Sequence, residues 1–167
     1  DVAARIRLTK GAVYWHFKSK PDLFAALVAD MTARHHERVT CVLPSPVSLE
    51  GLVAHFSERA QLIVSQPLNR KYFQMMLSVD WPAAKFISVK QRLRQLETGP
   101  FVILEKTLAA LQKAGAVKPE ADIATAGAVL SAMWLGLMKL KIDQCLEVHL
   151  PKAIDVGFRT VLDTIRA

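Results

Sequence analysis

The chain has 167 residues, of which 51% are hydrophobic and 22% are charged, and its 7 glycines and 8 prolines form no linker-like run. This composition excludes a largely disordered chain, and the length predicts one domain or a large domain with a small appendage. The formal net charge of +7 favours an anionic partner, although charge alone does not separate nucleic acid from a membrane surface.

Apolar residues recur at helical spacing along almost the whole chain, which predicts an all-α fold. A short helix over 1–6, a turn and a second helix over 10–17 open the chain. Pro21 suits the first turn of a third helix, with Ser19 as its cap. The buried stripe of that third helix is expected to contain Leu23, Leu27, Val28 and Met31.

The segment Leu43-Pro44-Ser45-Pro46 is predicted to end the third helix, because neither proline can continue it. We place the boundary between two domains here, at 1–43 and 44–167. The next helix is expected to end at Gln66-Pro67, with Glu50, Glu58 and Arg59 outside its apolar face. That face contains Leu49, Leu52, Phe56, Ala60 and Ile63.

A shorter helix over 68–79 is followed by a long helical region from Trp81 to Lys113. Pro100, after Gly99, removes one backbone hydrogen bond from this region. The sequence leaves open whether Gly99-Pro100 kinks the helix or breaks it.

Helices over 122–143 and 151–165 are expected to close the fold. The longest uncharged run, 123–138, has 16 residues, fewer than the roughly 20 needed to cross a bilayer, so it is interpreted as a buried helix. Its apolar residues occupy two neighbouring faces. Either both faces pack within one chain, or one forms a dimer interface made by the last two helices.

Positive charge is concentrated near the start of the chain. No acidic residue occurs between positions 5 and 20, whereas five basic residues do: Arg5, Arg7, Lys10, Lys18 and Lys20. Such a cluster can follow a phosphate backbone, and two short helices joined by a tight turn suit a helix-turn-helix motif.

The second short helix has the residue types that a DNA-reading helix needs. Thr9 can cap the helix and bond a phosphate, and small residues at its start permit close approach to bases. We expect the DNA contacts to come from Thr9, Lys10, Gly11, Ala12, Tyr14, Trp15, His16 and Lys20. The alternative for the aromatic residues is core packing, which is the role expected for Phe17.

The pattern Val2-Ala3, Thr9, Gly11, Tyr14, His16-Phe17, Lys20 and Leu23 resembles the DNA-binding signature of the TetR family of transcriptional regulators, in particular its AcrR-like, multidrug-responsive branch. The resemblance implies that Thr9, Tyr14 and Lys20 hold phosphates and that the other five residues approach bases. Two departures stand out: Ile6-Arg7 replaces the usual Ala-Gly turn, and the family's first helix is missing from this sequence.

By the same resemblance, the larger domain is a ligand-binding and dimerisation body. Aromatic and methionine side chains suit a pocket for variable, hydrophobic ligands, although ordinary core packing is the alternative for each of them. The candidate ligand-binding residues are Phe56, Arg59, Phe73, Met76, Trp81, Phe101 and Trp134.

No pattern in the sequence predicts an enzyme, a metal or a cofactor. His35 and His36 are adjacent on a helix and diverge by about 100°, so they cannot chelate one ion together. Cys41 and Cys145 lack metal-like spacing and fit a reducing, cytoplasmic setting.

The sequence therefore predicts a cytoplasmic, homodimeric repressor that binds a double-stranded DNA operator and is released by a hydrophobic small molecule. Two alternatives remain: a DNA-binding regulator with no small-molecule effector, and a helical interaction module or enzyme whose basic head is incidental.

Overall fold

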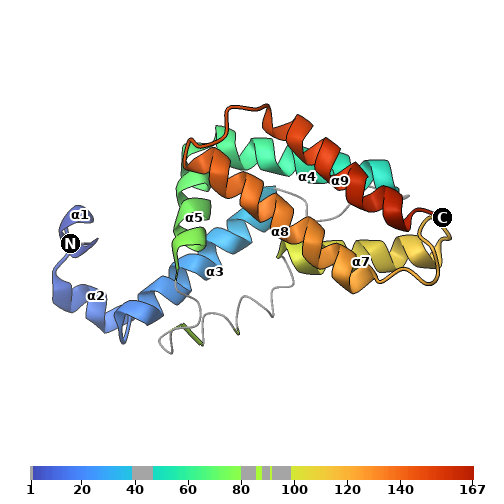
Figure 1. Ribbon diagram of the computed structural model, residues 1–167. Helices are drawn as coiled ribbons and strands as arrows, with labels where there is room; N and C mark the ends of the chain where they lie inside the picture. The colour runs from blue at the N-terminus through green and yellow to red at the C-terminus, as the bar shows by residue number, and fades with distance from the viewer. Residues whose placement is uncertain (1, 39–46, 80–85, 88–90, 92–98) are drawn as a thin grey trace.

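The computed structural model describes residues 2–38, 47–79, 86–87, 91 and 99–167 (Figure 1). These residues form α-helices and contain no β-strand, as the sequence predicts. The helices are α1 (Val2–Arg5), α2 (Lys10–His16), α3 (Lys20–Arg38), α4 (Leu49–Ser65), α5 (Pro67–Ser78), α7 (Pro100–Lys113), α8 (Ile123–Ile142) and α9 (Leu150–Ile165).

The head consists of α1 to α3, and local capping fixes where α2 and α3 begin. Thr9 has extended backbone angles, and its Oγ1 accepts a hydrogen bond from the amide of Ala12 at 3.1 Å. At the start of α3, Ser19 Oγ accepts from the amide of Asp22 at 3.2 Å, while Asp22 Oδ2 accepts from the amide of Lys18 at 2.9 Å. Both predicted caps, Thr9 and Ser19, are confirmed.

The turn between α1 and α2 has a left-handed residue where glycine would be free of strain. The amide of Leu8 bonds to the carbonyl of Ala3 at 3.0 Å, and the amide of Arg7 bonds to that of Ala4 at 3.2 Å. This Schellman pattern puts Arg7 at a φ of +56°. A side chain there costs about 1 kcal/mol or more, so the chain accepts strain in this turn.

The predicted stripe of α3 is correct for Val28, which is 1% exposed, but wrong for Leu27, which is 44% exposed. The Phe24 ring contacts that of Phe86, with centroids 5.3 Å apart. Because Phe24 and Val28 are four residues apart, they share the packed face, and Leu27 lies beside that face.

The body is built around α8, which packs against α4, α5, α7 and α9. Figure 1 shows α4 and α9 running side by side along one edge of the body, with α7 along the other. All five residues of the predicted apolar face of α4 are buried. Arg59 is buried as well, contrary to expectation, because it lies three residues after Phe56 and so borders that face.

The question at Gly99-Pro100 is resolved in favour of a break. Gly99 has φ −67° and ψ 150°, which is extended backbone, and α7 starts at Pro100. Proline is well tolerated at a first helical position because its missing N–H has no partner there anyway. The predicted boundary at 43–46 lies outside the described residues.

Helix α8 is, by length and composition, the one helix among the described residues that could span a membrane, a test that core helices of soluble proteins also pass. In the structure, Leu130, Trp134 and Met138 on this helix are fully buried against the other helices of the body. The interpretation of 123–138 as a buried helix is therefore confirmed for this side of α8.

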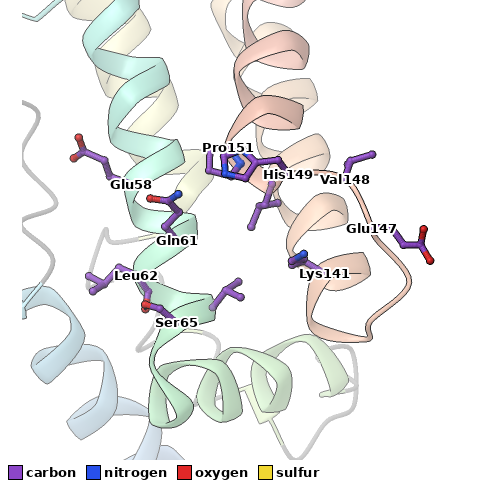
Figure 2. Close-up of a pocket in the computed structure, with 11 residues that line it drawn as sticks. Glu58, Gln61, Leu62, Ser65, Lys141, Glu147, Val148, His149 and Pro151 are labelled. Atoms are coloured by element: carbon purple, nitrogen blue, oxygen red, sulfur yellow. The ribbon is translucent and has the colours of Figure 1, made fainter.

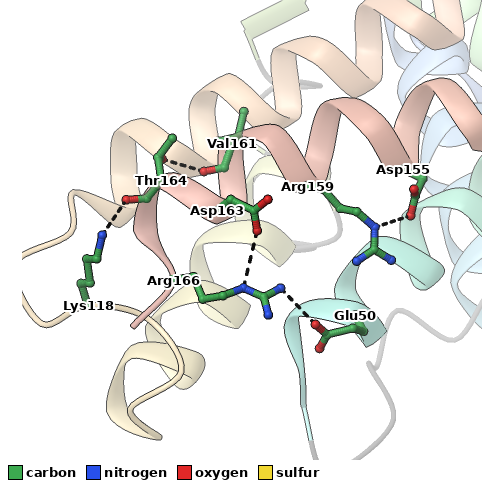
Figure 3. A network of polar contacts seen from close by, with 8 residues as sticks. All are labelled: Glu50, Lys118, Asp155, Arg159, Val161, Asp163, Thr164 and Arg166. Carbon is green, nitrogen blue, oxygen red and sulfur yellow. Dashed lines mark hydrogen bonds and ion pairs between the residues drawn. The ribbon is translucent and has the colours of Figure 1, made fainter.

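The C-terminus is tied to the body by polar contacts (Figure 3). Arg166 donates to Glu50 at the start of α4 at 3.0 Å and lies 3.6 Å from Asp163. The ammonium of Lys118 donates to the carbonyl of Thr164 at 3.2 Å. These side chains are exposed, so the contacts fix the register of the tail more than they stabilise the fold.

Candidate nucleic-acid interface

Helix α2 presents its aromatic side chains to solvent. Tyr14 is 64% exposed and Trp15 is 84% exposed, and no residue of α2 is buried. The Trp15 and His16 rings meet edge to face, with centroids 5.0 Å apart. Large aromatic side chains that a chain leaves uncovered mark a surface for a partner.

Five basic residues at the start of the head lie on its surface: Arg5, Arg7, Lys10, Lys18 and Lys20 are exposed. Two of them, Lys10 and Lys20, line a groove of about 500 Å³ between α2 and the start of α3. Tyr14 also lines this groove, so one phenol-bearing and two ammonium-bearing side chains border the same space. That combination suits phosphate oxygens.

Gly11 has no internal reason to be glycine. A Cβ atom at this position would find only Thr9 Oγ1, at 3.8 Å, within contact distance. Glycine inside a helix costs about 1 kcal/mol relative to alanine. Gly11 and the half-buried Ala12 therefore leave the start of α2 open to close approach from outside.

The structure thus gathers the eight predicted DNA-binding residues on α2 and at the start of α3. Phe17, expected in the core, is half-buried and lines the groove beside Val13 and Leu23.

The candidate ligand-binding residues divide into two groups. Phe56 and Trp134 are fully buried and meet edge to face, with ring centroids 5.7 Å apart, and the Phe73 ring also meets Trp134 edge to face at 5.5 Å. The indole Nε1 of Trp134 donates to the carbonyl of Phe56 at 3.0 Å. These three side chains form one aromatic cluster in the body, with Phe158 against Phe56 at 5.3 Å.

The other candidates lie on α4, α5 and α7, or are not placed. Arg59 is buried on α4, Met76 is half-buried on α5, and Phe101 is 41% exposed on the first turn of α7. Trp81 lies outside the described residues. A role in ligand binding remains a prediction for all seven.

His55 is a half-buried polar residue that the sequence analysis did not single out. Its Nε2 is shielded from solvent and has no hydrogen-bond partner in the described part of the chain. Burial lowers the pKa of this imidazole below its ordinary value of 6.5, and the charge of Arg59 lowers it further. The one available signal was its place four residues before Arg59 on the same helix.

Within the described ranges, no three His, Cys, Asp or Glu side chains gather into a metal site. The side chains of His35, His36 and Cys41 lie outside the described residues, and Cys145 is an exposed thiol in the loop after α8. That the protein uses neither metal nor cofactor stays an expectation.

Comparison with known proteins gives a family match for the first 27 residues and similar folds among solved structures. Residues 1–27 match the family described as bacterial regulatory proteins, tetR family. A candidate fatty acid metabolism regulator from Clostridium perfringens has a similar fold, with a TM-score of 0.69, 18% identity, and coverage of 99% of this chain and 87% of that one.

The reduced form of NemR from E. coli is also similar, with a TM-score of 0.60, 19% identity, and coverage of 99% of this chain and 83% of that one. A comparison with curated protein sequences found no match. The family match over the head and the shared all-α fold, a helix-turn-helix head on a helical body, together support a transcriptional regulator that binds DNA.

Proposed function

We propose that this protein is a ligand-responsive transcriptional repressor that binds a pseudo-palindromic DNA operator as a homodimer in the cytoplasm. The observation that carries the proposal is α2 itself, a helix with no buried residue that exposes Tyr14 and Trp15 inside a basic surface. The match of residues 1–27 to regulatory proteins supports the same conclusion.

In this proposal α2 lies in the major groove. Thr9 and Tyr14 bind phosphates on one side, and Lys20 binds a phosphate at the start of α3. The Thr9 hydroxyl remains able to donate, since its oxygen acts as acceptor in the cap. Base contacts come from Lys10, Gly11, Ala12, Trp15 and His16.

The dimer forms through α8 and α9. One face of α8 stays exposed despite being apolar or small, with Val129 at 46% and Leu140 at 44% exposed and Ala132 and Gly136 between them. On α9, Val156 is 57% exposed. In the proposal a second copy covers this surface, and the two reading helices of the dimer lie roughly 34–36 Å apart, the spacing of one turn of DNA.

The effector is a hydrophobic small molecule bound in the body, as in the AcrR-like regulators of multidrug efflux that the head resembles. The aromatic cluster of Phe56, Phe73 and Trp134 supplies apolar contacts, and His55 and Arg59 add polar groups on α4. A ligand that prefers one arrangement of the body changes the spacing of the heads and releases DNA.

Operator binding as a function of salt tests the proposal. Footprinting on the DNA upstream of the protein's own gene should show a protected, two-fold symmetric site. Lys20→Ala should weaken binding to all sequences alike and reduce the slope of log K against log salt by about 0.9, the value for one lost phosphate contact.

Lys113→Ala, an exposed lysine at the end of α7, is the matched control and should leave the salt slope unchanged. Absence of a protected site would count against the repressor. An unchanged slope for Lys20→Ala would remove only the role of that lysine.

A further inference from the structure

A second pocket lies in the body, away from both the head and the aromatic cluster. It has a volume of about 770 Å³ and lies between the C-terminal half of α4, the end of α8 and the loop that leads into α9 (Figure 2). Small-molecule sites typically measure about 300–1,000 Å³. None of the residues proposed above to bind DNA or effector lines it.

Apolar side chains form much of the pocket wall. Leu150 is 4% exposed and belongs to the main core, so this part of the wall is fixed by packing. The apolar lining residues are Leu62, Val64, Val148, Leu150 and Pro151. A ligand with a hydrocarbon body would therefore bury apolar surface here.

A lysine lines the pocket, and few contacts within the described chain balance its charge. Lys141 is half-buried, and its ammonium has three donors, of which one makes a long hydrogen bond of 3.4 Å to the carbonyl of Leu146. No carboxylate of the described chain forms an ion pair with it. Lys139, two residues earlier, is paired with Asp143 instead.

The remaining polar groups decide whether the pocket favours a negatively or a positively charged ligand. Figure 2 shows Gln61 on α4 and Lys141 on α8 at opposite sides of the pocket, whereas the carboxylates of Glu58 and Glu147 point outward from its rims. His149 lines the pocket at the start of α9 and makes no capping hydrogen bond with its side chain. The pocket therefore offers the ammonium of Lys141 together with the amide of Gln61 and the imidazole of His149.

We propose that this pocket binds a small organic anion, a monocarboxylate with an apolar body, and that Lys141 binds its carboxylate. The charge-assisted hydrogen bond to the ammonium is of the strong kind, and Gln61 and His149 can donate to the same oxygens. The hydrocarbon end of the ligand lies on Leu62 and Leu150. The site is separate from the effector site proposed above.

Calorimetric titration of the full chain with octanoate tests this site. Octanoate should bind, and octan-1-ol and octylamine, which keep the hydrocarbon but lose the negative charge, should bind at least about tenfold more weakly. Lys141→Met should lower the affinity for octanoate by about tenfold or more. Lys139→Met is the matched control on the same helix and should not change it.

A second variant guards against misfolding of the first. Gln61→Trp leaves residue 141 as lysine but places a bulky side chain in the pocket, and it should also abolish octanoate binding. Circular dichroism of each variant should match that of the unaltered protein. The proposal is overturned if octanoate does not bind, if its affinity survives both substitutions, or if octan-1-ol binds equally well.

Discussion

Truncation of Trp134 and of Trp15 to alanine should change the stability of the fold by very different amounts. Trp134 is 1% exposed, contacts Phe56 and Phe73 and donates to the carbonyl of Phe56, whereas Trp15 is 84% exposed. Replacing a buried Trp by Ala costs about 3–5 kcal/mol, a large share of a typical total of about 5–15 kcal/mol. Trp15→Ala should change the free energy of unfolding by no more than about 0.5 kcal/mol.

The assay is urea unfolding of both variants at one protein concentration, since a dimer's stability depends on concentration. Trp134→Phe separates the contribution of ring packing from that of the hydrogen bond, because it keeps an aromatic ring but loses the hydrogen bond to the carbonyl of Phe56. Its free energy of unfolding should lie between those of Trp134→Ala and Trp15→Ala. In operator binding the order of the effects should be reversed, because Trp15→Ala should alter the preference of the protein for particular DNA sequences. This assignment of roles would be refuted if Trp134→Ala lowered the free energy of unfolding by less than about 1 kcal/mol, or if Trp15→Ala lowered it by more than about 1 kcal/mol.

Three further outcomes follow from single positions. Arg7→Gly should relieve the left-handed strain of about 1 kcal/mol, offset in part by the greater freedom of glycine in the unfolded chain, so thermal unfolding should show a small gain; a clear loss would contradict it. Burial lowers the pKa of His55 in the folded state, so the contribution of this residue to stability is complete above the ordinary pKa of 6.5 and is lost as pH falls through the folded-state pKa. His55→Gln should therefore flatten the dependence of the unfolding free energy on pH in that acidic range. An unchanged pH dependence would exclude the effect. Val129→Glu on the exposed face of α8 should produce monomers in analytical ultracentrifugation, and a dimer of unchanged affinity would place the interface elsewhere.

Helix starts could be predicted because the interactions that set them are local. The hydroxyls of Thr9 and Ser19 reach amides only three residues away, and Pro67, at the first position of α5, acts within one turn. The departure at Ile6-Arg7 was visible in the sequence, whereas the left-handed φ of Arg7 came from the structure. The eight DNA-binding candidates lie within twelve positions, so local geometry alone gathers them on one surface.

Burial of particular side chains on the body helices could not be predicted in the same way. Arg59 and His55 lie at the edge of an apolar stripe, and only the helices that cover that edge decide whether they are buried. Gly99-Pro100 was undecided for a related reason, because proline permits both a kink and a break and the rest of the fold selects one.

The sequence by itself determined an all-α chain, the order of its helices and a basic reading helix at its start, because caps, turns and helical periodicity act over a few residues. Only the tertiary structure decided which face of α8 is buried, that Phe56, Phe73 and Trp134 meet, and that Lys141 faces a pocket shared with α4 and α9. Those contacts join residues far apart in the chain, and the packing of whole helices, rather than any local preference, brings them together.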